Sequence, residues 1–289
     1  MNYKKKGFTI IELLTVISVM AILVGLLLPA INMVHKMAKE AAERAQLNTI
    51  ELALLAFRND QGYYPPSDNP GPPDGPGDYS GAQKLAEALV GLDLLGFHKD
   101  SVFRSNGWDS TNTFQLYTDD NLSISMRKGP YLELATTNVF RVGNISVDKP
   151  GLFPLSDLGR IAPDTYVLCD VFGVKKVKIP TAKTVKAGTP ILYYRANASA
   201  MDIDVLTPET NRVYNVWDNL MFARIGCLNP DLRHKKVDAP GDDFYEYIKD
   251  PRISPPVTNR RRPYRPDSYL LISAGADGMY GTSDDICNF

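Results

Sequence analysis

A long apolar run near the N-terminus limits what this chain can fold into. From Phe8 to Ile31 nearly every residue is apolar, and at about 1.5 Å per residue a helix of this length spans a hydrocarbon core of roughly 30 Å. The run is too long, and apolar on too many sides, for the core helix of a soluble domain. The sequence therefore predicts a membrane-spanning helix over residues 8–31.

One carboxylate interrupts this run. Glu12 lies near its start, where an ionised side chain costs on the order of 2–3 kcal/mol or more unless another group neutralises it. We therefore expect the group that compensates Glu12 to be central to function.

The residues before Glu12 follow a specific arrangement. Lys4–Lys6 form a short basic stretch, Gly7 and Phe8 follow it, and Gly7 precedes Glu12 by five residues. This arrangement resembles the type IV prepilin signature, which pilins share with the pseudopilins of type II secretion systems. The resemblance implies that a prepilin peptidase cuts between Gly7 and Phe8 and that the new amine of Phe8 is methylated. It also implies that this ammonium meets Glu12 of a neighbouring subunit, because two costly buried charges become tolerable together.

Two other segment types share this hydrophobicity. A secretory signal needs a small-residue cleavage site after its apolar core, and residues 28–32 supply a poor one. A plain single-pass anchor explains the apolar run and its basic flank but not the position of Gly7 before Glu12. With Lys4–Lys6 in the cytoplasm, we expect a single-pass protein of the bacterial inner membrane with a periplasmic globular domain. After assembly, we expect the protein to be part of a filament.

The helical pattern continues beyond the apolar run. Between Asn32 and Arg58 apolar residues recur three and four apart, with charged residues between them, as in a helix with one buried face. Pro29 removes one amide donor and leaves the carbonyl of Gly25 without its helical partner, so it predicts a kink or a loosening of the helix. The resemblance implies that Pro29 also matters for assembly. Gly62 can form a left-handed cap.

These signals divide the chain into three regions. We expect a leader over residues 1–7, a long helix over 8–62 and a globular domain over 63–289. The helix exit, Asp60–Pro65, is similar to the D-x-G-x-Y-P segment that closes the long helix of major pseudopilins.

The globular region predicts an α+β fold, with the long helix packed on an antiparallel sheet. Residues 82–90 predict a short helix that stops at Gly91. Segments rich in Val, Ile and Tyr predict strands at 131–134, 139–142, 165–169, 171–178, 191–195 and 269–273. The short gap between 166–169 and 174–177 favours their antiparallel pairing.

Charge and cysteine content set further limits. The chain has 32 Lys and Arg against 33 Asp and Glu; without the three leader lysines the balance is 29 − 33 = −4, which gives no electrostatic case for nucleic acid. The three cysteines, Cys169, Cys227 and Cys287, do not imply a disulfide framework, although one bond is possible in an oxidising compartment. We expect them to be buried small apolar side chains.

No catalytic pattern is present in the sequence. The three histidines, His35, His98 and His234, lie far apart, and there is no zinc spacing, nucleophile elbow, phosphate-binding loop or dinucleotide fingerprint. We therefore do not expect an enzyme.

An acidic, glycine-rich loop closes the chain. Asp277, Asp284 and Asp285 follow a predicted strand, with glycines at 275, 278 and 281 that let the backbone fold back. Hard cations such as Ca²⁺ take six to eight oxygens from carboxylates and carbonyls. The loop resembles the calcium loop of major pseudopilins, with its G-A-D-G and D-D-I-x-N-aromatic pattern. We expect a structural Ca²⁺ on Asp277 plus Asp284 or Asp285; the alternative is an Asp/Gly turn cluster with no metal.

Together these features are closest to the major (G-type) pseudopilins. We expect a structural subunit of a type II secretion pseudopilus, whose partners are other copies, other pseudopilins, the prepilin peptidase and the inner-membrane assembly platform. The alternatives are a type IV pilus or fibre subunit and a membrane-anchored periplasmic binding domain. Residues 66–267 make the chain longer than a typical major pseudopilin.

Overall fold

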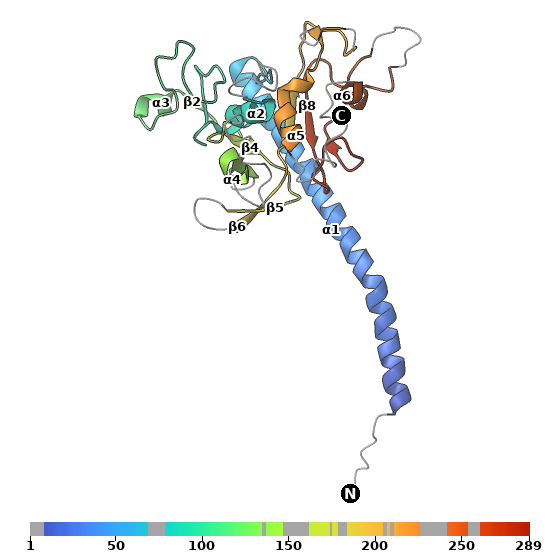
Figure 1. Cartoon of the computed structure of the whole chain (residues 1–289). Helices are drawn as coiled ribbons and strands as arrows, with labels where there is room; N and C mark the ends of the chain where they lie inside the picture. Colours follow the sequence, from blue (N-terminus) through green and yellow to red (C-terminus); the bar gives the residue numbers. More distant parts are fainter. Residues whose placement is uncertain are drawn as a thin grey trace. The chain divides into compact units, whose positions relative to one another are not determined.

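The fold was analysed in a computed structural model (Figure 1). The structure describes residues 9–68, 79–134, 137–146, 162–173, 175–178, 184–204, 207–208, 211–225, 242–253 and 261–289. The chain forms two compact units, Met1–Ala41 and Ala42–Phe289. The predicted leader and Phe8 lie outside the described residues.

The predicted long helix is confirmed as α1, Ile10–Gln61. It continues through Pro29 without a break in the helical assignment. It ends as expected at Gly62, which has a φ of 83° and donates its N–H to the carbonyl of Arg58 at 2.7 Å. A positive φ suits glycine, and the hydrogen bond satisfies one of the free carbonyls at the helix end.

The part of α1 in the second unit is amphipathic. Each of its buried residues has another one three or four positions away, and all of them lie on one face: Glu43, Leu47, Ile50, Ala53, Leu54 and Phe57. This spacing is the one that the sequence predicts. Glu43 is the polar exception on that face.

The second helix, α2 (Gly81–Val90), is buried along its whole length. Ser80 and Gln83 cap its start reciprocally, and Gly91 follows its end with a φ of 84°, which confirms the prediction for 82–90. Gly81 is required here, because a Cβ at this position would lie 2.2 Å from the carbonyl oxygen of Tyr193. The helix therefore packs closely against β4 and β7.

In the part of the chain that the structure describes, the strands form four small antiparallel sheets rather than one. The pairs are β1 (Phe97–His98) with β2 (Arg127–Lys128), β3 (Val139–Arg141) with β4 (Tyr166–Leu168), and β5 (Lys175–Lys178) with β6 (Thr184–Ala187). The fourth sheet has the order β7 (Leu192–Arg195), β8 (Tyr269–Ser273), β9 (Ile286–Cys287). Short helices complete the fold: α3 (Asn121–Ser125), α4 (Val142–Ser146), η3 (Val216–Asn219), α5 (Leu220–Ile225) and α6 (Asp242–Tyr247).

The central strand β8 is buried along both faces. Tyr269 and Leu271 belong to a core that includes Leu54 and Phe57 of α1, whereas Leu270 and Ile272 belong to the core on the other side. This alternation follows from the two-residue period of a strand. The globular unit therefore has one core between α1 and the sheet and a second core beyond it.

Two strand predictions are wrong. Residues 131–134 are not a strand, since the amide of Tyr131 donates to the carbonyl of Leu89 at the end of α2. The segment 166–169 does not pair with 174–177. Instead β4 pairs with β3, and β5 pairs with β6. The predictions at 139–142, 165–169, 191–195 and 269–273 are confirmed within one or two residues at their ends.

A buried aspartate explains the wrong pairing. The amide of Asp170 donates to Thr189 at 2.9 Å, and its carboxylate accepts the amides of Phe172 at 3.0 Å and Thr189 at 3.1 Å. These bonds turn the chain after β4 and fix it to the segment before β7. A hairpin from β4 into β5 would break them.

Candidate functional site

The N-terminal candidate site lies at the start of α1. Gly7 and Phe8 are outside the described residues, so cleavage and methylation there stay predictions. Glu12 is in the first turn of α1, and its Oε2 accepts the amide and the hydroxyl of Thr9, both at 2.8 Å. The amide of Glu12 donates to the Thr9 hydroxyl at 3.2 Å. This reciprocal pattern resembles a capping box and holds the carboxylate at the helix N-terminus.

The helix surface around Pro29 is apolar. Every Ile, Leu, Val and Met from Ile10 to Met37 is exposed, and the least exposed of them, Ile31, still exposes 41% of its surface. Within the described residues α1 is the one helix long and apolar enough to cross a membrane. A surface this apolar is not stable in water and needs lipid or other apolar helices around it.

The acidic C-terminal loop folds back on itself as the sequence predicts. Asp284 Oδ2 accepts the amides of Ala276 at 2.8 Å and Asp277 at 3.1 Å, and its Oδ1 accepts the Thr282 hydroxyl at 2.6 Å. Gly275, with a φ of 66°, lies so close that a Cβ would be 2.2 Å from the Asp284 carbonyl oxygen. The loop therefore depends on glycine at this position.

Two of the three predicted metal ligands lie together. Burial raises the pKa of Asp277, and the nearby charge of Asp284 raises it further, while the Met279 amide opposes the shift. Asp285 is held differently, because its carboxylate accepts the Gly281 amide at 2.7 Å and the Tyr247 hydroxyl.

Burial raises the pKa of Asp285 to about 6 against these two donors. Among the described residues no group of three or more His, Cys, Asp or Glu side chains is placed to hold a metal ion. A cation at this loop would therefore rely on Asp277 and Asp284 together with backbone carbonyls.

The residues after this loop fasten it to α1. Asn288 Nδ2 donates to Glu51 at 2.9 Å, and its Oδ1 accepts the Leu271 amide at 2.9 Å. The Arg265 guanidinium bonds both Glu51 and the carbonyl of Asn288. No sequence pattern indicates this cluster, because Glu51 and Arg265 are distant in the chain and Arg265 lies in a basic stretch typical of a solvated loop.

A buried polar network joins α2 to the segment after it. Glu87 accepts the hydroxyls of Tyr79 at 2.6 Å, Ser101 at 2.5 Å and Tyr117 at 2.9 Å. Burial raises the pKa of Glu87, and the three hydroxyls oppose that shift. Three donors around one buried carboxylate satisfy it without a metal. No pattern in the sequence indicates this arrangement.

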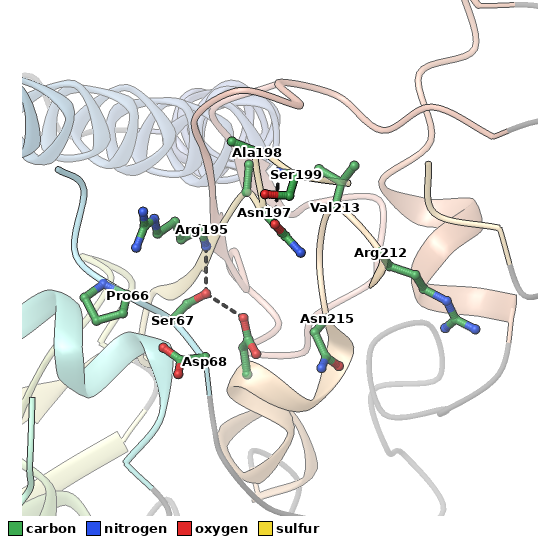
Figure 2. Close-up of a pocket in the computed structure, with 12 residues that line it drawn as sticks. Pro66, Ser67, Asp68, Arg195, Asn197, Ala198, Ser199, Arg212, Val213 and Asn215 are labelled. Carbon is green, nitrogen blue, oxygen red and sulfur yellow. Dashed lines mark hydrogen bonds between the residues drawn. The ribbon is translucent and has the colours of Figure 1, made fainter. Parts of the chain in front are cut away.

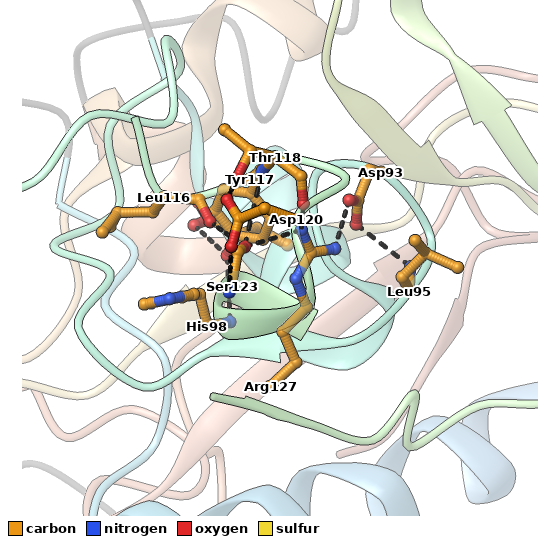
Figure 3. A network of polar contacts seen from close by, with 10 residues as sticks. Asp93, Leu95, His98, Leu116, Tyr117, Thr118, Asp120, Ser123 and Arg127 are labelled. Carbon is orange, nitrogen blue, oxygen red and sulfur yellow. Dashed lines mark hydrogen bonds and ion pairs between the residues drawn. The ribbon is translucent and has the colours of Figure 1, made fainter. Parts of the chain in front are cut away.

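The same network continues to a buried arginine, which Figure 3 shows. Arg127 pairs with Asp93, donates to the carbonyl of Thr118 at 2.9 Å and to Ser123 at 3.1 Å, and lies over the ring of Tyr117 at 5.2 Å. These contacts fix the loops on either side of α3, so their role is structural.

An open pocket of about 540 Å³ lies between the residues after α1 and the end of β7. The Ser67 hydroxyl accepts the Arg195 amide at 2.8 Å and donates to the buried Asp218 at 2.5 Å. Figure 2 shows Ser67 and Arg195 at this pocket. Among the described residues, those that line the pocket include neither His nor Cys, so no described imidazole lies beside Ser67 to act as a base.

Two cysteines fall within the described residues and both are free thiols. Cys169 is buried as predicted, whereas Cys287 is half-buried and lies 3.2 Å from the Tyr247 hydroxyl. Cys227 lies outside the described residues.

Comparison with known proteins identifies one motif. Residues 2–28 match the family described as the prokaryotic N-terminal methylation motif. This match covers Gly7, Phe8 and Glu12, and it indicates a type IV pilin-like precursor that is processed by a prepilin peptidase. Together with the exposed apolar surface of α1, it supports membrane anchoring and assembly into a filament. No curated protein and no solved structure matches the chain.

Proposed function

We propose that this chain is a structural subunit of a type II secretion pseudopilus. Cleavage between Gly7 and Phe8 releases an amine that becomes methylated, and this amine neutralises Glu12 of a neighbouring copy in the filament. The observation that carries the proposal is the methylation motif over residues 2–28 on a helix whose apolar side chains are all exposed from Ile10 to Met37. Such a helix gains stability when other helices cover it.

The acidic loop favours the secretion branch over a pilus. Its glycine-dependent fold around Asp284 and its likeness to the calcium loop of major pseudopilins support this choice. We include in the proposal one structural Ca²⁺ held by Asp277 and Asp284, with backbone carbonyls completing the shell. The cation relieves the repulsion between these two carboxylates and stabilises the folded state by mass action.

Processing is tested by replacing Gly7 with a bulky residue. The mass of the N-terminal peptide is measured from cells that contain the prepilin peptidase. The wild-type protein is expected to begin at methylated Phe8, and the variant to keep residues 1–7. A wild-type protein that retains its leader would refute the proposal.

Assembly is tested separately with Glu12→Ala. Crosslinking between copies in membranes is expected to fall while cleavage continues, because the carboxylate and not the cut site is changed. A plain anchor would tolerate Glu12→Ala without loss of crosslinking. Long surface fibres, with no defect in secretion when the gene is deleted, would instead favour a pilus.

Calcium binding is tested by thermal unfolding of the full chain in detergent micelles. Millimolar Ca²⁺ is expected to raise the Tm of the wild-type protein and to leave Asp277→Asn and Asp284→Asn less affected, with Mg²⁺ as the control ion. An unchanged wild-type Tm would remove Ca²⁺ from the proposal and leave its processing part intact.

A further inference from the structure

Glu43 is an acidic residue on the buried face of α1. Its relative exposure is 0%, and its neighbours on that face are apolar. Its Oε2 accepts the amide of Val171 at 2.9 Å. Its Oε1 is buried and has no hydrogen-bond partner among the residues that the structure describes. A buried carboxylate with one unsatisfied oxygen is costly, so the structure must compensate it in some other way.

A second unsatisfied atom lies beside it. Ser273, at the end of β8, is also fully buried, and in the described part of the chain its hydroxyl oxygen has no hydrogen-bond partner. The Ser273 hydroxyl is near enough to Glu43 to act on its ionisation. An ionised Glu43 can only accept the Ser273 O–H and stays a buried anion, whereas a protonated Glu43 is neutral and can donate a hydrogen bond to that hydroxyl.

Two titratable groups in the loop after β4 lie near Glu43. They are Cys169 and Asp170, which directly precede Val171, whose amide bonds Glu43. Burial raises the pKa of the Cys169 thiol, and the negative charges of Asp170 and Glu43 raise it further, which places both carboxyls near that thiol. Arg44, the next residue of α1, acts instead on Cys287.

Burial also raises the pKa of Glu43 above its ordinary value, and the Val171 amide and the Ser273 hydroxyl oppose that shift. An ionised Glu43 would therefore be a buried anion on a helix face whose other buried side chains are apolar. Taking up a proton removes this cost and satisfies both orphaned oxygens.

We propose that Glu43 is protonated in the folded protein and that its Oε1–H donates a hydrogen bond to Ser273 Oγ. Packing of α1 on β8 then takes up one proton from solvent, which is released when the globular unit unfolds. The stability of the contact between the long helix and the sheet therefore depends on pH. Acidification stabilises this contact, and alkaline pH destabilises it.

The test compares wild-type protein, Glu43→Gln and a control, Glu40→Gln, as full chains in detergent micelles. Glu40 lies on the same helix, where its side chain is 37% exposed and 3.8 Å from Lys36. Urea unfolding is measured from pH 4 to pH 8. Glu43→Gln keeps the shape of the side chain and can bond both Val171 and Ser273, but it cannot ionise.

The sign of the effect follows from linkage. A carboxyl whose pKa is higher in the folded state stabilises the protein fully below its unfolded pKa of about 4.3. That stabilisation is lost as the pH rises toward the folded value. The ratio of the wild-type unfolding constant to that of Glu43→Gln is therefore expected to be flat at low pH and then to rise about tenfold per pH unit. Glu40→Gln should follow the wild-type curve.

Infrared spectroscopy gives an independent measurement. The wild-type minus Glu43→Gln difference spectrum should contain the C=O band of a protonated carboxylic acid at pH values where an exposed glutamate is ionised. Parallel pH curves, or a difference spectrum with only carboxylate bands, would overturn the proposal. So would failure of Glu43→Gln to fold, or wild-type stability that depends on Na⁺, Mg²⁺ or Ca²⁺ and loses that dependence in Glu43→Gln. Failure of Glu43→Gln to fold would mean that Glu43 must be charged, and the cation dependence would mean that a cation compensates that charge.

Discussion

Leu54 and Leu52 offer a direct test of how α1 packs on the globular unit. They have the same side chain and lie two positions apart on one helix, but Leu54 exposes 0% of its surface and Leu52 exposes 68%. Because helix propensity is the same for both, Leu→Ala at the two positions isolates the effect of burial. The expected loss is large at Leu54 and small at Leu52.

The magnitude follows from the surroundings of Leu54. Fully burying a leucine contributes about 1.5–3 kcal/mol, and truncation also leaves a cavity, which brings observed Leu→Ala losses to about 2–5 kcal/mol. The neighbouring core side chains Phe57, Leu85 and Leu271 are themselves fully buried. Since this core has little freedom to collapse around a cavity, we expect a loss of about 3 kcal/mol at Leu54 and less than about 0.5 kcal/mol at Leu52.

The assay is urea unfolding of the full chain in detergent micelles, followed by tyrosine and tryptophan fluorescence. The midpoint should fall clearly in Leu54→Ala and stay at the wild-type value in Leu52→Ala, with the same slope in all three proteins. Equal losses at the two positions, or a loss below about 1 kcal/mol at Leu54, would refute the packing of this face of α1.

Three further predictions use the same unfolding assay. Gly275→Ala should lose about 2 kcal/mol or more, because a Cβ would contact backbone in the acidic loop, whereas Gly62→Ala, also at positive φ but with nothing within 4 Å, should lose only about 1 kcal/mol; equal losses would contradict this reasoning. Tyr117→Phe removes one of three donors to buried Glu87 and should cost about 1–3 kcal/mol; an unchanged midpoint would show that the network does not need it. Glu51→Ala breaks the bonds that fasten the C-terminal residues to α1 and should cost about 1–2 kcal/mol, with faster proteolysis at the C-terminus; an unchanged cleavage rate would rule that role out.

Local sequence signals predicted α1 and α2 well. Apolar spacing and Gly62 fixed the extent of α1 in the globular unit, and Ser80, Gln83 and Gly91 are ordinary helix boundary residues. The fold of the C-terminal loop around Asp284 also follows from local pattern, since its hydrogen bonds join residues only two to eight positions apart. These features depend on short-range interactions that a single sequence contains.

Long-range interactions could not be predicted in this way. Asp170 joins the chain after β4 to the segment before β7, and its residue type does not reveal that it caps a buried turn. Glu51 meets Arg265 across more than two hundred residues of chain. Glu87 has the ordinary appearance of a helix surface residue, and only the packing of Tyr79 and Tyr117 around it makes it a buried acceptor. In each case the role of a polar side chain depends on partners that are distant in the chain, and the local sequence pattern does not predict those partners.

Glu12 and Glu43 show why one acidic residue of α1 is suited to assembly and the other is not. Glu43 has an amide and a hydroxyl of its own subunit within reach, so a single proton completes its environment and no second copy is needed. Within the described residues the Glu12 side chain has only Thr9 as a bonded neighbour, and a threonine offers no positive charge. In an apolar setting a neutral donor offsets less of the cost of an ionised carboxylate than an ammonium does. According to the proposed function, the Phe8 amine of another copy pairs with Glu12 and offsets the remaining cost of its charge. The register between copies then depends on this carboxylate.

Glu12→Gln should therefore weaken crosslinking between copies, while Glu43→Gln should leave crosslinking unchanged at neutral pH. The reverse result would show that assembly depends on Glu43 and not on Glu12.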